Sequence, residues 1–151
     1  MSIIESIRTY IMECPFLKDG RFNVGYLGYE PCEYTIDSVP ASIIIKRYVD
    51  GDSLRQFEFI FASREEYNIS TVKNMVSSAF YEEFAAWLEK QTADKNLPAM
   101  AEGQHPQKIE AVSSGYLFQT GPNTARYQIQ CRLTYYQEFY CKEATTYGNT
   151  D

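Results

Sequence analysis

Hydrophobic residues recur every three or four positions in two stretches of the chain, and this spacing predicts two amphipathic helices. The first covers residues 2–14 with four isoleucines on one face, and Ser2 followed by Glu5 forms a capping box at its start. The second covers residues 70–91. Its apolar face is predicted to contain Val72, Met75, Val76, Ala79, Phe80, Phe84, Trp87 and Leu88. Both helices therefore carry a face suited to packing on a sheet.

Alternating apolar and polar residues predict a hairpin in residues 42–63. A strand over residues 43–49 is joined to a return strand over residues 54–61 by Asp50 and Gly51, a dipeptide that suits the central positions of a type I′ turn. The return strand has a face expected to meet a helix, made of Phe57, Phe59 and Phe61.

The remaining strand patterns complete an α+β fold. Residues 16–31 are predicted to form a loop before a strand over residues 32–37. A second hairpin is predicted from residues 108–119 and 125–136, with its tip at residues 120–124. Its last strand is expected to bury Tyr127, Ile129, Cys131, Leu133 and Tyr135, and to expose Gln128, Gln130, Arg132 and Thr134. The order α-β-β-β-α-β-β predicts an antiparallel, mixed-order sheet with both helices packed on one face.

Length and loop chemistry predict one domain followed by a tail. A chain of 151 residues corresponds to about one domain, and we assign residues 1–137 to a single α+β domain. Residues 138–151 are polar and lack core periodicity, which predicts a C-terminal tail that is flexible or docked on a neighbouring subunit. Residues 91–107 predict a loop too long for a simple connection, and such loops usually serve a function.

Composition narrows the class of function. Acidic residues outnumber basic ones by 20 to 14, and the net charge of −6 argues against a nucleic-acid-binding surface. The N-terminal residues lack the basic start and apolar core of a signal peptide, and no stretch approaches the ~18 consecutive apolar residues of a membrane span. We therefore expect assembly in a cytoplasm and no membrane contact. The 13 tyrosines and 9 phenylalanines indicate a surface that binds other proteins.

Residue types for catalysis or metal binding are sparse in this sequence. The four cysteines lack metal-site spacing and are expected to be free thiols rather than two disulfides: Cys14, Cys32, Cys131 and Cys141. His105 is the single histidine and has no nucleophile at a motif spacing. The acidic pairs within residues 50–52 and 65–66 are explained by a turn and by a strand end. We therefore expect no enzyme activity, no catalytic residue, no cofactor and no metal.

Several segments resemble small proteins encoded in the tail-gene modules of Firmicutes phages and prophages. The resemblance is carried by residues 45–65, which read IKRYVDGDSLRQFEFIFASRE, by FAAWL at 84–88, by GYLF at 115–118 and by YQIQC at 127–131. Similar proteins are labelled minor capsid or tail proteins. The order of elements over roughly residues 1–137 is similar to that of phage tail terminator, or tail completion, proteins.

This resemblance implies a structural role without covalent chemistry. Members of the family form a ring, usually a hexamer, on the head-proximal end of a tail tube, in a virion or in a headless tail-like bacteriocin. The ring stops tube polymerisation and offers a docking surface for a head-tail connector or a sheath. The implied partners are further copies of the chain, the tail tube protein, and the sheath or connector protein. DNA would pass through unbound, because an acidic lumen repels it.

Interface candidates come from the pattern alone, because the family supplies no motif that transfers residue by residue. They are Tyr48, Asp50, Gly51, Asp52, Asn96, His105, Tyr136, Phe139, Tyr140 and Tyr147. The alternative for each segment is an ordinary solvated loop. For the whole chain, the alternatives are a connector, tube or baseplate component of the same assembly, and a small-ligand-binding or enzymatic α+β domain.

Overall fold

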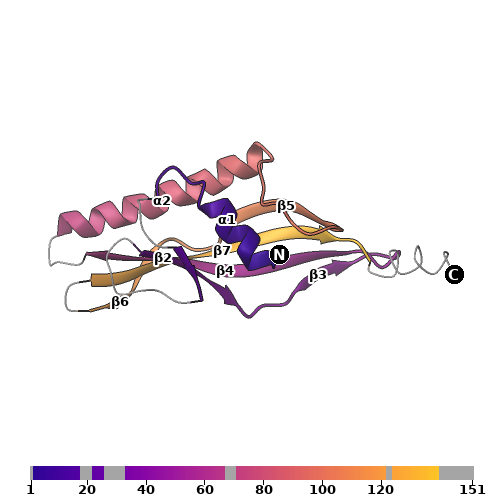
Figure 1. Ribbon diagram of the computed structural model, residues 1–151, viewed down its shortest axis with the longest axis horizontal. Coiled ribbons are helices and arrows are strands. Elements are labelled where there is room, and N and C mark those ends of the chain that lie inside the picture. The colour runs from indigo at the N-terminus through magenta and orange to yellow at the C-terminus, as the bar shows by residue number, and fades with distance from the viewer. Residues whose placement is uncertain (1, 18–21, 26–32, 67–70, 122–123, 140–151) are drawn as a thin grey trace.

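The computed structural model describes residues 2–17, 22–25, 33–66, 71–121 and 124–139. Within these residues two helices lie on one face of a seven-stranded sheet, which confirms the predicted α+β class (Figure 1). The elements in chain order are α1 (Ile3–Ile11), β1 (Phe22–Val24), β2 (Glu33–Val39), β3 (Ile44–Arg47), β4 (Ser53–Glu66), α2 (Thr71–Ala93), β5 (Gln104–Ala111), β6 (Tyr116–Thr120) and β7 (Thr124–Gln137). No helix among the described residues combines the length and the apolar character needed to cross a membrane.

Two long strands form the centre of the sheet. β4 and β7 are antiparallel and pair along all 14 residues of each, from Ser53 opposite Gln137 to Glu66 opposite Thr124. Each has two short antiparallel strands on its outer side: β2 and β3 beside β4, and β5 and β6 beside β7. β1 pairs with β2 in parallel, so the sheet is mixed and the prediction of a wholly antiparallel sheet is wrong at this edge, where no strand was predicted. The short strands β3 and β6 consequently lie at opposite corners of an elongated sheet (Figure 1).

Aromatic packing under the helices forms the core. The rings of Phe61 on β4 and Phe84 on α2 are stacked with centroids 4.6 Å apart, and Tyr34 stacks on Phe61 at 5.7 Å. The five residues predicted to point inward from the last strand are all buried. At ~1.5–3 kcal/mol for each large apolar side chain, this cluster is the main source of stability that the fold offers.

The helix predictions hold, with one change of face. α1 has the predicted capping box, in which Glu5 N–H donates to Ser2 Oγ and Ser2 N–H donates to Glu5 Oε2. On α2, Ala79 was predicted to lie on the buried apolar face but is exposed. Tyr81 was not predicted to lie on that face but is only 1% exposed. The position of Tyr81 is explained by its hydroxyl, which donates to the Tyr127 carbonyl oxygen at 2.9 Å and so satisfies a buried polar group. The side chains of residues 71–78 lie outside the described part.

Several predicted strands and loops differ in their bounds from the structure: β3 ends at Arg47 rather than at residue 49, and β4 continues to Glu66 rather than ending at residue 61. β1 lies within residues 16–31, which were predicted to be loop, and its three residues are too few to show a period. The predicted strand 108–119 is two strands, β5 and β6, that pair separately with β7. The loop predicted over residues 91–107 is confined to residues 94–103, because α2 continues to Ala93 and β5 begins at Gln104. Pro106 misled the prediction; it is tolerated in β5 because that strand lies at the sheet edge and has a register shift there.

Burial on the open face of the sheet also differs from the prediction. Gln128 and Thr134 were expected to be exposed, but both are buried. Gln128 is held by neighbours on the same face: its Nε2 donates to the Tyr116 hydroxyl at 2.6 Å, and its Oε1 accepts from Arg126 Nε at 3.0 Å. Alternation therefore predicted the direction of these side chains and missed that neighbouring residues cover them.

Candidate interface

The turn between β3 and β4 leaves an apolar residue at its tip. Gly51 N–H donates to the Tyr48 carbonyl oxygen at 3.0 Å, and Tyr48 N–H donates to the Asp52 carbonyl oxygen at 2.9 Å. The backbone angle φ is +96° at Gly51. It is not positive at Asp50, because Lys95 is the one non-glycine with positive φ among the described residues. The type I′ prediction is therefore wrong, since that turn needs positive φ at both central positions. Val49 occupies the turn and is fully exposed.

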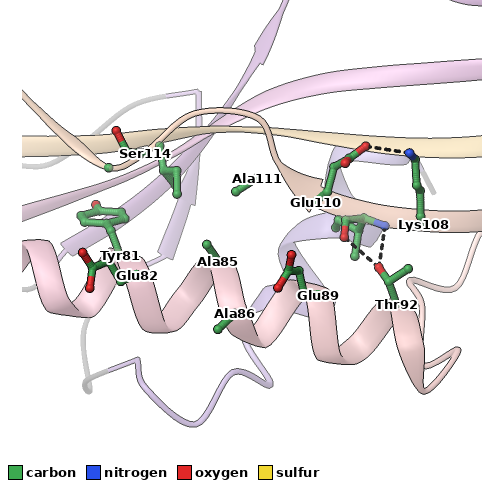
Figure 2. A pocket seen from close by; sticks show the side chains of 13 residues that line it. Tyr81, Glu82, Ala85, Ala86, Glu89, Thr92, Lys108, Glu110, Ala111 and Ser114 are labelled. Atoms are coloured by element: carbon green, nitrogen blue, oxygen red, sulfur yellow. Dashed lines mark hydrogen bonds and ion pairs between the residues drawn. The ribbon is translucent and has the colours of Figure 1, made fainter.

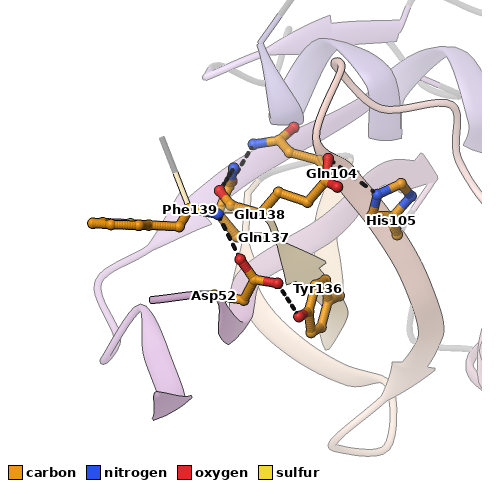
Figure 3. Close-up of polar contacts among 7 residues, drawn as sticks. All are labelled: Asp52, Gln104, His105, Tyr136, Gln137, Glu138 and Phe139. Atoms are coloured by element: carbon orange, nitrogen blue, oxygen red, sulfur yellow. Dashed lines mark hydrogen bonds and ion pairs between the residues drawn. The ribbon is translucent and has the colours of Figure 1, made fainter. Parts of the chain in front are cut away.

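Asp52 joins this hairpin to the residues that follow β7 (Figure 3). Its side chain is 3% exposed, and its Oδ1 accepts from the Phe139 backbone N–H at 2.8 Å. Its Oδ2 accepts a short hydrogen bond from the Tyr136 hydroxyl. That bond, followed by desolvation and nearby negative charge, raises the pKa of Tyr136 to about 12. Asp52 thus keeps the phenol neutral and fixes residues 136–139 against the hairpin.

Aromatic rings surround the same hairpin end. The Tyr48 and Tyr136 rings are 5.7 Å apart, and the Lys46 ammonium lies 5.3 Å from the Tyr48 ring centroid. The Phe139 ring lies against Gly51 so closely that a Cβ added there would come within 2.5 Å of the Phe139 Cγ. A side chain at position 51 would therefore displace Phe139.

The structure brings together most of the predicted interface residues. We call this group the hairpin end: Tyr48, Asp50, Gly51, Asp52, His105, Tyr136 and Phe139. His105 joins it because β5 pairs His105 with Tyr136, and its Nε2 lies 3.6 Å from Glu138 Oε2. This exposed ion pair contributes little stability. Asn96 belongs elsewhere, since it follows α2 and its carbonyl oxygen accepts from the Tyr10 hydroxyl at 2.9 Å. Tyr140 and Tyr147 lie outside the described residues.

Sequence reasoning missed a groove between α2 and β5 (Figure 2). Its volume is about 490 Å³, and it exists because the facing side chains are small, namely Ala85, Ala86, Ala111 and Gly115. At one end the Thr92 hydroxyl donates to the Ile109 carbonyl oxygen at 2.8 Å and accepts from the Ile109 N–H at 3.0 Å. At the other end Gly115 allows the chain to approach Tyr81: a Cβ at position 115 would come within 2.5 Å of the Tyr81 Cγ.

The rim of the groove is acidic. Glu82 and Glu89 are exposed on α2, two turns apart and on either side of the alanines. Glu110 on β5 is partly neutralised, because its Oε2 lies 3.2 Å from Lys108 Nζ and 3.3 Å from Arg132 Nη2. The Ala85-Ala86 pair in the predicted helix was the sequence feature that could have indicated a gap in packing.

A second exposed apolar surface lies beside the groove, at the corner opposite the hairpin end. Leu117 and Phe118 on β6, together with Val112 just after β5, are large apolar residues exposed to solvent. Ile43 and Ile45 are the corresponding exposed residues beside the hairpin end, and 58% of Ile43 is accessible. Met12 and Phe16, at and after the end of α1, are further exposed apolar residues. Contiguous exposed apolar patches are typical of binding surfaces, whereas single exposed apolar residues are common on any protein.

The described residues contain little reactive chemistry. They include no group of three His, Cys, Asp or Glu side chains close enough to hold a metal ion. Cys14 and Cys131 are free and buried, as predicted for Cys131, and burial raises the pKa of both thiols. Buried thiols of raised pKa are poor nucleophiles. Cys32 and Cys141 lie outside the described part of the chain.

Comparison of the sequence with models of known protein families finds no match, and comparison with curated proteins finds none either.

Proposed function

We propose that this protein is a structural component of a phage tail or phage-tail-like particle. In this role copies of the chain form a ring, most simply a hexamer, that caps the head-proximal end of the tail tube. The ring stops polymerisation of the tube protein and presents a docking surface to a connector or sheath protein. Assembly takes place in the cytoplasm of the bacterial host, and no covalent chemistry is involved.

One observation carries the proposal on the structural side: the molecule has two unlike exposed surfaces on different parts of an elongated sheet. One is the hairpin end with Ile43, Ile45 and Val49, and the other is the α2–β5 groove with β6 beside it. A closed ring needs heterologous contacts, in which one surface of each copy meets a different surface of the next. The sequence resemblance to tail terminator proteins supplies the kind of assembly in which such a ring would act.

The experiment is to determine the oligomeric state and then the effect on tube growth. Light scattering and negative-stain microscopy of the purified chain should show single closed rings, and the rings should shorten tubes grown from the cognate tail tube protein. A strict monomer that never associates with tubes would contradict the proposal. Long tubes formed by the chain alone would instead indicate a tube protein.

A second measurement tests the relation to DNA. The net charge of −6 predicts that isolated rings do not retain duplex DNA at moderate salt, since affinity for DNA comes mostly from Lys and Arg contacts to phosphates. Tight, salt-sensitive binding in a filter or mobility-shift assay would exclude a passive lumen.

A further inference from the structure

We propose that the tip of the β3–β4 hairpin of one copy inserts into the α2–β5 groove of the next copy. This inference rests on the proposed ring and names the contact that closes it. Val49 enters between Ala85 and Ala86 on one side and Ala111 on the other, and basic residues of β3 meet the acidic rim.

The apolar tip is the first element of this contact. Turn positions usually carry Gly, Pro, Asn, Asp or Ser, yet Val49 stands fully exposed in this turn. The carboxylate of Asp50 is directed back to the hairpin, since its Oδ1 accepts from Asp52 N–H at 3.0 Å. Val49 therefore projects from the tip beside a carboxylate whose Oδ1 is already hydrogen-bonded within the hairpin. Burying this side chain in an apolar groove would be favourable.

The groove is the complementary element. Its volume of about 490 Å³ leaves room for more than one side chain, and its walls are apolar where Ala85 on α2 and Ala111 on β5 face each other (Figure 2). The Thr92–Ile109 hydrogen bonds and the Tyr81–Gly115 contact fix both ends, so the groove is formed before any partner arrives. Preformed sites avoid the ordering cost of binding.

Charge complements shape at the two surfaces. Lys46 and Arg47 are exposed on β3 immediately before the tip, whereas Glu82 and Glu89 are exposed on the groove rim. Opposite charges on facing surfaces select the partner and speed its association. Lys46 and Arg47 are consecutive in β3 and point to opposite faces of the strand, so one cation would lie on each side of the seated Val49, near the acidic rim.

The contact must join different copies. Pairing of β3 with β4, together with the Asp52 hydrogen bonds to residues 136 and 139, holds the tip in its own sheet and away from its own groove. Each copy therefore offers a free tip and a free groove, which is the head-to-tail arrangement that closes into a ring. The exposed residues of β6 then remain available for a different neighbour.

Disulfide trapping tests the contact directly. In a Cys32→Ser/Cys141→Ser background, oxidation of the Val49→Cys/Ala86→Cys variant should give a ladder of covalent oligomers that ends at the number of subunits in the ring. Either single variant should give dimers at most. The matched control Val49→Cys/Met12→Cys has its second cysteine on the exposed end of α1 and should give no ladder.

Charge reversal provides an independent test. Lys46→Glu/Arg47→Glu should weaken assembly at least about tenfold, and so should Glu82→Lys/Glu89→Lys; mixing the two variants should restore mixed contacts. Lys90→Glu/Lys95→Glu lies outside both surfaces, makes the same change in net charge as Lys46→Glu/Arg47→Glu, and should assemble normally. All six substituted positions are exposed, so circular dichroism should show every variant folded.

The outcomes separate this contact from the proposed function. If the wild type forms rings, both charge-reversal variants still form them and the double-cysteine variant gives no ladder, the contact is wrong but the ring stands. A ladder without closed rings would support the contact and overturn the ring. If the wild type is a monomer and the double-cysteine variant gives no ladder, both the contact and the ring are wrong.

Discussion

Two pairs of aromatic residues, each with one member on a central strand of the sheet, have opposite surroundings. Phe61 and Phe84 are stacked 4.6 Å apart under α2, and both are fully buried. Tyr48 and Tyr136 lie 5.7 Å apart at the hairpin end, beyond the helices, where Tyr48 keeps 36% of its surface exposed (Figure 1). In the first pair the apolar area has already left water and stabilises the fold. In the second, much of that area is still available for a partner, and the phenol groups suit a half-solvated position.

Truncating the buried pair should have the largest effect. Phe84→Ala is expected to lower the free energy of unfolding by about 3–5 kcal/mol, because it removes a fully buried ring and leaves a cavity. Urea titration monitored by the fluorescence of Trp87, whose ring lies 6.1 Å from Phe84, measures this change. Tyr48→Ala is the matched change at the hairpin end and should cost about 1 kcal/mol or less while reducing assembly. Equal losses for the two variants would contradict the comparison.

Adding a methyl group at Gly115 should have the next largest effect. Gly115→Ala places a Cβ within 2.5 Å of the Tyr81 Cγ, so α2 must move away from the sheet, at a cost of about 1–3 kcal/mol. Thermal unfolding provides the measurement. Gly121→Ala is the control, since its nearest neighbour would be the Thr124 carbonyl oxygen at 3.4 Å. A Gly115→Ala variant as stable as the control would show that α2 is not held this closely.

Alkaline pH should also lower the free energy of unfolding, through Tyr81 in the core between α2 and the sheet. Burial raises the pKa of Tyr81 well above its usual value of about 10, so the folded state favours the neutral phenol. The stabilisation is fully present below the unfolded pKa of about 10 and is lost as pH rises above it, by up to about 1.4 kcal/mol per pH unit. Unfolding free energies measured at pH 8–11 should fall less steeply for Tyr81→Phe than for the wild type. An unchanged slope would assign the effect to other groups.

The smallest effect is expected at Asp52. Asp52→Asn keeps an acceptor oxygen but removes the charge and one acceptor, so stability should fall by only about 1 kcal/mol. The pKa of Tyr136 should fall from about 12 toward 10, because the carboxylate that favours the neutral phenol is gone. An NMR titration of the tyrosine Cζ resonances follows this shift. If the pKa stayed near 12, Asp52 would not be its cause.

Regular periods made part of the fold predictable. The capping box and isoleucine stripe of α1 predicted that helix, and alternation in β7 predicted its five inward-facing residues but not the burial of Gln128 and Thr134. β1 has too few residues to show a period, and the break at Gly115 between β5 and β6 depends on the close approach of α2. In each case a tertiary contact decided the local structure, and a single sequence does not contain it.

The candidate interface was predictable to a similar extent. Asp50-Gly51 marked a turn, but the bond between Asp52 and Phe139 joins residues 87 positions apart, so no local pattern reveals it. The groove depends on which strand faces Ala85 and Ala86. That partner is β5, a strand whose start at Gln104 the sequence assigned to a loop.

The unequal strand lengths have a mechanical consequence. A pull on the hairpin tip along the strand axis is transmitted through β4 to its 14-residue pairing with β7, where the cross-strand hydrogen bonds lie perpendicular to the force and resist shear together. β3 is paired with β4 at only three positions and can peel away one bond at a time. In the proposed ring, tension between neighbouring subunits would therefore extend the β3 side first and leave the central ladder intact.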